Sequence, residues 1–198
     1  MSALNKLTKD IRTQELRLHP DGYKFSCTFP IIKKSMQTDQ GWSIGVFNKE
    51  VEEIIQKYGD VQRHRTNVKA HMTNWFMHQE YDQFKVIADW AIDLAEKNSP
   101  HQVLLYVFDC WGAIYKRNDW TKAHDHWPSP WSFVYYVETD GKTPLAFPDA
   151  PQGAHYIYPK TGDMVMFPGW IRHSVPKHES DKKRIVVAGN LHLQMYLV

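Results

Sequence analysis

Two histidines separated by one residue are the first sign of chemistry in this chain. His124 and His126 lie in the segment AHDHW, and alternate side chains of a β-strand face the same side. Both imidazoles would then point into one cavity, while Asp125 points away. A third histidine, His173, follows in DMVMFPGWIRHSVP. Three such side chains on adjacent strands can occupy one face of an octahedral iron and leave its other positions open for substrate and oxygen. Because the chain has 11 histidines, the alternative is a chance pair of surface or turn histidines.

An arginine follows His173 after a short interval. Arg184 begins RIVVAGN, an apolar strand with one cation at its start. A guanidinium in this position can bind a carboxylate through two parallel hydrogen bonds, which lysine does less well. An ordinary charge at a strand end is the alternative.

The second half of the chain is predicted to be β-structure. It contains short β-branched or aromatic segments, separated by Pro, Gly and Asp turns at the spacing of a sandwich or barrel. These segments are VLLYVFDCW, HDHW, WSFVYYVE, PLAF, HYIYP, DMVMF and RIVVAGNLHLQMYLV.

The first half is predicted to carry one strand and two helices. A strand over Tyr23–Ile32 is interrupted by Pro30, which favours an edge position. A helix capped by Asn48 and ended by Gly59 follows, and a second helix is predicted over 79–98. The apolar stripe of the first helix is Val51, Ile54, Ile55 and Tyr58; that of the second is Phe84, Ile87, Ala91, Leu94 and Ala95.

Helices followed by strands in 198 residues predict one domain over 1–198, mainly β with N-terminal helices. Residues 1–100 would form a helical flank with an N-terminal strand, and 101–198 a two-sheet β-roll. A net charge of +2 without a basic block gives no indication of nucleic-acid binding. No apolar run approaches membrane-spanning length, and Cys27 and Cys110 are too few for a disulfide framework, so we expect a cytoplasmic protein.

Three segments together resemble iron(II)- and 2-oxoglutarate-dependent oxygenases of the prolyl-hydroxylase-like group, in particular a bacterial and phage subgroup. The segments are NDWTKAHDHWPSPWSFVYYVE, YPKTGDMVMFPGWIRHSVP and KRIVVAGN, which occur in that order within Trp111–Asn190. The resemblance implies a double-stranded β-helix, which is a jelly-roll or cupin-like core. It also implies Fe(II), 2-oxoglutarate and O2, and hydroxylation of a peptide or small molecule with release of succinate and CO2.

The resemblance also implies roles for residues around the histidines. Arg184 would bind the distal carboxylate of 2-oxoglutarate, and Tyr136 would hydrogen-bond it while Tyr135 faces the other side of the sheet. Further candidates for cosubstrate or rim contacts are Tyr115, Asn118 and Asn190. Four tryptophans near the predicted ligands would serve equally as pocket walls or as core filler: Trp120, Trp127, Trp131 and Trp170.

One feature departs from the family pattern of His-x-Asp/Glu with a distal His. His126 stands where the carboxylate is expected, so the sequence predicts a three-histidine site. A bulge that turns Asp125 inward is the alternative. Two other functions stay open: a cupin-like three-histidine dioxygenase without 2-oxoglutarate, which leaves Arg184 and Tyr136 without a role, and a noncatalytic β-roll that binds a ligand.

Overall fold

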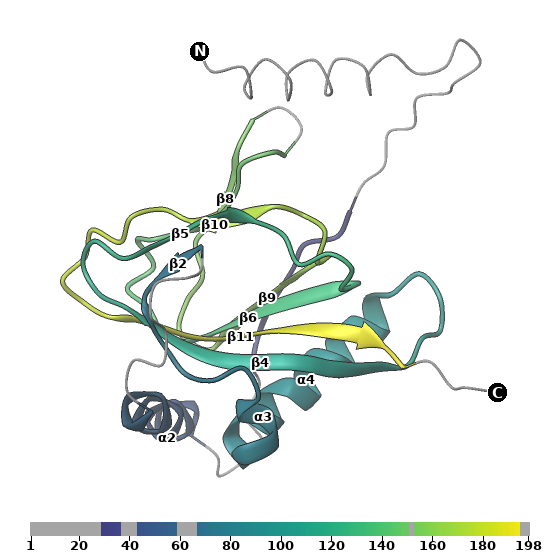
Figure 1. Cartoon of the computed structure of the whole chain (residues 1–198), viewed down its shortest axis with the longest axis horizontal. Coiled ribbons are helices and arrows are strands. Elements are labelled where there is room, and N and C mark those ends of the chain that lie inside the picture. The colour runs from purple at the N-terminus through teal and green to yellow at the C-terminus, as the bar shows by residue number, and fades with distance from the viewer. Residues whose placement is uncertain (1–28, 37–42, 59–66, 151–152, 195–198) are drawn as a thin grey trace.

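The fold is that of a computed structural model, which describes residues 29–36, 43–58, 67–150 and 153–194. Two antiparallel sheets face each other (Figure 1). The larger sheet has the order β1 (Ile32–Ser35), β9 (Asp163–Phe167), β6 (Trp131–Glu138), β11 (Arg184–Leu193), β4 (Leu105–Tyr115), β3 (His71–Met72). The smaller has the order β2 (Val68–Lys69), β5 (Trp120–His124), β10 (His173–Val175), β7 (Leu145–Phe147), β8 (His155–Ile157). The predicted two-sheet, mainly β architecture is confirmed.

Helices cover the outer face of the larger sheet (Figure 1). They are α2 (Ile44–Lys57), α3 (Met77–Glu80) and α4 (Asp82–Asn98), and all precede β4 in the chain. No described helix is long and apolar enough to span a lipid bilayer.

Strand alternation divides the core into two layers. Tyr135 packs with the helices on one side of the larger sheet, and Tyr136 packs between the two sheets on the other. The predicted opposition of these two tyrosines is therefore confirmed. The layer between the sheets is apolar apart from the site described below, because both faces that enclose it are built from inward residues of buried strands.

The first predicted helix begins earlier than its sequence indicated. Its N-cap is Ser43, so the prediction that Asn48 caps the helix is wrong. Asn48 lies inside α2 and is buried, with its Nδ2 donating to the Val137 carbonyl (2.8 Å) and its Oδ1 accepting from the Tyr135 hydroxyl (2.7 Å). Its polar side chain joins the helix to the sheet. From the sequence alone, an asparagine with this role cannot be distinguished from a helix cap. The predicted stop at Gly59 lies outside the described residues.

Two other boundaries also differ from the prediction. The first described strand is β1, which begins after Pro30, and the predicted residues 23–28 lie outside the described part of the chain. β1 is at the sheet edge, as predicted. The second helix is divided at Tyr81, whose extended backbone (φ −134°, ψ 126°) separates α3 from α4. The apolar stripe predicted for this helix is buried throughout.

Replacement of Asn48 by alanine should destabilise the protein by about 2 kcal/mol, because the Val137 carbonyl loses the Asn48 donor and the buried Tyr135 hydroxyl keeps only the weak Met36 sulfur acceptor at 3.7 Å. Urea unfolding measures the change. The matched control is Lys49→Ala on the exposed side of the same helix, which should change the free energy of unfolding by less than about 0.5 kcal/mol. Equal effects of the two substitutions would contradict this account of Asn48.

Candidate functional site

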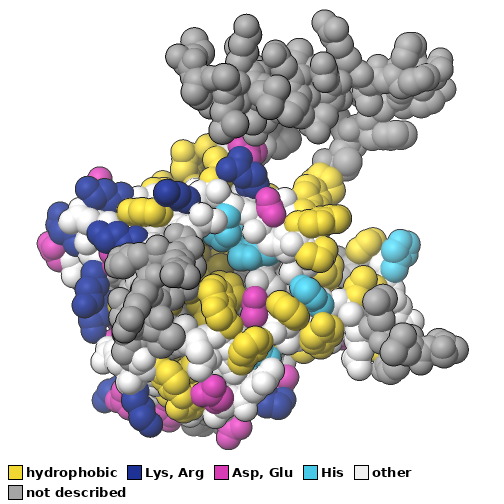
Figure 2. All heavy atoms as spheres, viewed as in Figure 1, with side chains coloured by type: hydrophobic (Ala, Val, Ile, Leu, Met, Phe, Trp, Pro, Cys, Tyr) yellow, Lys and Arg dark blue, Asp and Glu magenta, His cyan; other side chains and the backbone are white. Residues whose placement is uncertain are grey.

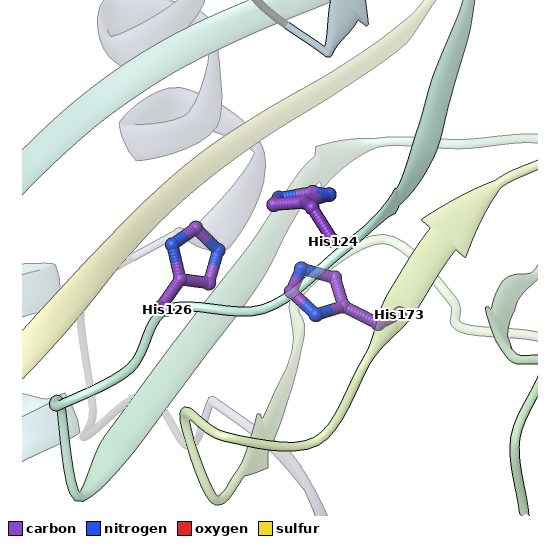
Figure 3. Close-up of side chains that lie close together, drawn as sticks. All are labelled: His124, His126 and His173. Atoms are coloured by element: carbon purple, nitrogen blue, oxygen red, sulfur yellow. The ribbon is translucent and has the colours of Figure 1, made fainter. Parts of the chain in front are cut away.

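Three histidines converge in the cavity between the sheets (Figure 3). His124 ends β5 and His173 begins β10, and these two residues are directly opposite in the antiparallel pair. His126 follows two residues beyond the end of β5. One ring nitrogen from each histidine lies within 4.8 Å of the others, a separation that one metal ion can bridge.

The route by which His126 enters the cavity differs from the one predicted. Strand β5 stops at His124, so strand alternation does not govern the next two residues. The chain instead turns against Gly169, whose carbonyl accepts the His126 N–H (2.7 Å). A Cβ at Gly169 would collide with the Ser129 backbone, so only glycine permits this approach.

Asp125 lies outside the histidine group. Its side chain is exposed, and its Oδ1 accepts the backbone N–H of Trp127 (3.2 Å). No bulge turns it inward, and the geometry therefore favours the three-histidine arrangement over the one that includes this carboxylate.

The histidines are prepared to act as neutral ligands. Burial lowers the pKa of all three, to about 4 for His126, and their mutual proximity lowers those of His126 and His173 further. The Nδ1 of His124 lies 2.8 Å from the Lys122 carbonyl, and that of His173 lies 3.2 Å from the Ile171 carbonyl. Since a carbonyl only accepts, Nδ1 carries the proton in both rings and Nε2 keeps its lone pair for a metal.

Arg184 is a buried cation in the same cavity. It is 1% exposed, and Nη2 donates to the Tyr136 hydroxyl (3.2 Å). Its guanidinium carbon lies 4.9 Å from the Tyr115 ring centroid and 5.1 Å from that of Tyr136. Its Nε is buried without a hydrogen-bond partner, and no carboxylate of the described residues forms an ion pair with it. An isolated buried charge is costly, so this guanidinium is arranged to receive an anion.

The register of β11 with β4 aligns the cavity wall. Arg184 is opposite Tyr115, Val186 opposite Ala113 and Ala188 opposite Trp111, and these pairs form one row on the face toward the smaller sheet. Trp111 was not among the predicted site residues, although its ring centroid lies 6.2 Å from that of His126. Its even separation from Tyr115 along a strand was the sequence signal that could have identified it.

Two residues that were predicted to contact the cosubstrate, Asn190 and Asn118, have other partners in the structure. Asn190 continues the row from Arg184, but its amide is already bonded to protein groups: Oδ1 accepts from Ser132, and Nδ2 donates to Asp109. Asn118 is exposed in a turn with φ 73°, and its backbone N–H donates to the His178 carbonyl. It does not line the cavity.

None of the four tryptophans predicted near the ligands lines the cavity. Trp131 belongs to the helix-side core and donates its indole N–H to Ser99. Trp127 is largely exposed, Trp120 lies beneath the Lys122 ammonium, and Trp170 packs edge-on against Phe29. For Trp131 the role is core packing, the alternative that the sequence left open.

Comparison with known proteins agrees with this geometry. A family model described as putative 2OG-Fe(II) oxygenase matches residues 145–190, a segment that includes His173 and Arg184. No curated protein sequence matches the chain.

Solved structures with the same fold include two prolyl hydroxylases and a protein that binds 2-oxoglutarate. The viral collagen prolyl hydroxylase of Paramecium bursaria Chlorella virus-1, in complex with 2OG, has a TM-score of 0.61 and 16% identity, over 81% of this chain and 94% of that one. HygX of Streptomyces hygroscopicus, with nickel, 2-oxoglutarate and hygromycin B, has a TM-score of 0.62 and 8% sequence identity, over 83% of each chain. A Trichoplax adhaerens prolyl hydroxylase, in complex with a hypoxia inducible factor peptide fragment, has a TM-score of 0.60 and 14% sequence identity, over 96% of this chain and 94% of that one.

The metal ligands can be separated by two neighbouring substitutions. His126→Ala should abolish stoichiometric binding of Mn(II) or Fe(II), because it removes one of three converging nitrogens. Asp125→Ala should leave binding intact, since this carboxylate points to solvent. Metal analysis of the gel-filtered proteins measures both. Loss of metal from Asp125→Ala with retention in His126→Ala would contradict the assignment.

Proposed function

We propose that this chain is an iron(II)- and 2-oxoglutarate-dependent oxygenase, the class with which its family match, its fold and its cavity agree. Three histidines hold the metal, and Arg184 binds the cosubstrate. The observation that carries the proposal is the buried, unpaired guanidinium in the same cavity as the three imidazoles. A metal site alone would not require it.

The donor set suits iron(II). Imidazole nitrogen is a common ligand of this ion, and the three rings converge with lone pairs that require no deprotonation at neutral pH. When bound, the metal supplies the activation of O2 that couples conversion of 2-oxoglutarate to succinate and CO2 with hydroxylation of a second substrate.

Arg184 and Tyr136 together form the site for the distal carboxylate. The unpartnered Nε of Arg184 gains an acceptor there. Since Nη2 of Arg184 donates to the Tyr136 oxygen, the Tyr136 hydroxyl hydrogen is free to donate to the same carboxylate. Burial raises the pKa of Tyr136, so this group keeps its proton.

The rest of the wall is apolar and keeps water from the cosubstrate. Its side chains come from both sheets and surround the space between Arg184 and the histidines. They are Ala113, Val134, Leu145, Phe167, Val175 and Val186. In such surroundings an ion pair with Arg184 is stronger than in water.

The charges of the site discriminate between the proposed enzyme and a three-histidine dioxygenase that lacks 2-oxoglutarate. Three neutral imidazoles leave the full charge of the metal, and Arg184 adds one further positive charge. A dianionic cosubstrate with one carboxylate at each end places a negative charge beside each of these centres. Without it Arg184 would remain a buried charge with no counterion, so the observation on Arg184 favours the 2-oxoglutarate enzyme.

Arg184→Ala should weaken binding of 2-oxoglutarate to the manganese-loaded protein by roughly 30-fold or more, because truncating one member of a buried ion pair costs on the order of 2–5 kcal/mol. Manganese stoichiometry should not change. Arg184→Lys should recover part of the loss, since it restores the charge without the planar fork. Calorimetric titration measures these affinities.

The control for this series is the neighbouring residue, Lys183→Ala, which removes a half-exposed cation that pairs with Glu52. It should leave the affinity unchanged. Equal 2-oxoglutarate affinity in wild type and Arg184→Ala, or none in either, would remove the cosubstrate and favour the cupin-like function.

A further inference from the structure

The row of residues on β11 and β4 that faces the smaller sheet continues beyond the pair Ala188 and Trp111. After Ala188 and Trp111, the next pair in register is Asn190 with Asp109, followed past a bulge by His192 with Tyr106. Asp109 therefore stands about 7 Å further along β4 than Trp111, on the same face. It lies on the opposite side of Trp111 from Arg184's partner Tyr115.

Asp109 is a partly buried carboxylate with one unused oxygen. Its Oδ1 accepts the backbone N–H of Asn190 (3.0 Å) and the Asn190 Nδ2–H (2.8 Å). Among the described residues, Oδ2 has no hydrogen-bond partner and no cation forms an ion pair with this carboxylate. Burial raises the pKa of Asp109 to about 6, so the two bonds from Asn190 do not fully compensate the loss of water.

The carboxylate is connected to the cavity through hydrogen bonds. Asn190 accepts a hydrogen bond from the Ser132 hydroxyl (2.7 Å), and Ser132 lines the cavity that contains the histidines. The same asparagine thus fixes Asp109 and contacts the cavity wall. This arrangement holds the carboxylate in one orientation, two hydrogen bonds away from a residue of the cavity wall.

Aromatic side chains stand at neighbouring positions on both sides of Asp109. Phe108 is stacked on His192, with ring centroids 4.3 Å apart and planes within 5°. Trp75 packs edge-on against Trp111 at 4.7 Å. Phe108 and Trp75 are both exposed, so these rings face solvent at the surface. Figure 2 shows several histidine side chains next to hydrophobic ones on the face that it draws.

We propose that Asp109 and the aromatic pairs beside it bind an alkylammonium group of the enzyme's second substrate. A carboxylate with aromatic neighbours is the chemistry that recognises an ammonium ion, since the acid supplies a charge-assisted hydrogen bond and the ring faces attract the cation. The inference rests on the proposed function, because it assigns the substrate of that same site.

The charge at the metal gives this contact an orienting role. With a divalent metal bound, the metal and Arg184 would together carry three positive charges, and dianionic 2-oxoglutarate would leave one of them uncompensated. An ammonium is therefore repelled from the metal and attracted to Asp109. The substrate is held by its cation at the outer end of the row, with another of its carbons near the histidines.

The test uses protein loaded with Mn(II) and 2-oxoglutarate and three probes with one skeleton: n-hexylamine, n-hexanol and hexanoate. Ligand-observed NMR measures their affinities at pH 7, and broadening of probe signals by Mn(II) reports proximity to the metal. Wild type should bind hexylammonium at least about tenfold more tightly than hexanol, as expected for a charge-assisted hydrogen bond. Asp109→Asn should remove this preference, and Asp109→Lys should reverse it in favour of hexanoate.

The control is Asp181→Asn, which removes one negative charge from an exposed ion pair with Arg117 and should keep the preference for the amine. If wild type binds all three probes equally, shows no measurable amine binding, or if Asp109→Asn retains the preference, the inference is overturned. Binding of Mn(II) and 2-oxoglutarate is measured in the same samples. If every variant binds Mn(II) and 2-oxoglutarate but lacks the preference for the amine, this inference fails alone. If Mn(II) and 2-oxoglutarate do not bind either, the proposed function fails as well.

Discussion

Strand β11 lies between β6 and β4, and its hydrogen bonds to both neighbours fix which of its side chains face the cavity. Strand β11 packs closely against both neighbours at Gly189, where a Cβ would lie 2.5 Å from the Asp109 carbonyl oxygen of β4 and 2.7 Å from the Phe133 ring of β6. A shift of one residue would turn Arg184 to the helix side of the sheet. The position of the guanidinium, and of everything aligned with it, depends on this pairing.

The second constraint is the cost of burying a positive charge. The layer between the sheets is apolar, and the Tyr115 and Tyr136 rings beside Arg184 provide only partial compensation. The histidines present the opposite situation, since burial keeps them neutral and available to a metal. A molecule that carries a carboxylate for Arg184 and metal-binding oxygens at its other end satisfies both, and 2-oxoglutarate has this chemistry.

Much of this arrangement could be predicted from particular residues. The HxH spacing, the distal His173 and Arg184 at the start of an apolar strand are local patterns, and the structure brings all four side chains to one cavity. Strand alternation does not explain the position of His126, however, because β5 ends at His124 and a turn against Gly169 carries the next histidine inward.

Residues whose role depends on tertiary partners could not be predicted in the same way. The sequence predicts Asn48 as a helix cap, whereas its hydrogen bonds go to Val137 and Tyr135 on a strand nearly 90 residues later. Asp109 gave no signal in the sequence, since its significance comes from pairing with Asn190 across two strands.

The most direct test of the account is anaerobic reconstitution of the purified protein with Fe(II) and 2-oxoglutarate, followed by visible absorption. Chelation of the metal by the keto acid gives a weak visible charge-transfer band. We expect the band only when both are present, and expect it to be absent when succinate replaces 2-oxoglutarate. Stoichiometric iron binding with no band at saturating 2-oxoglutarate would contradict the central claim that one cavity holds both.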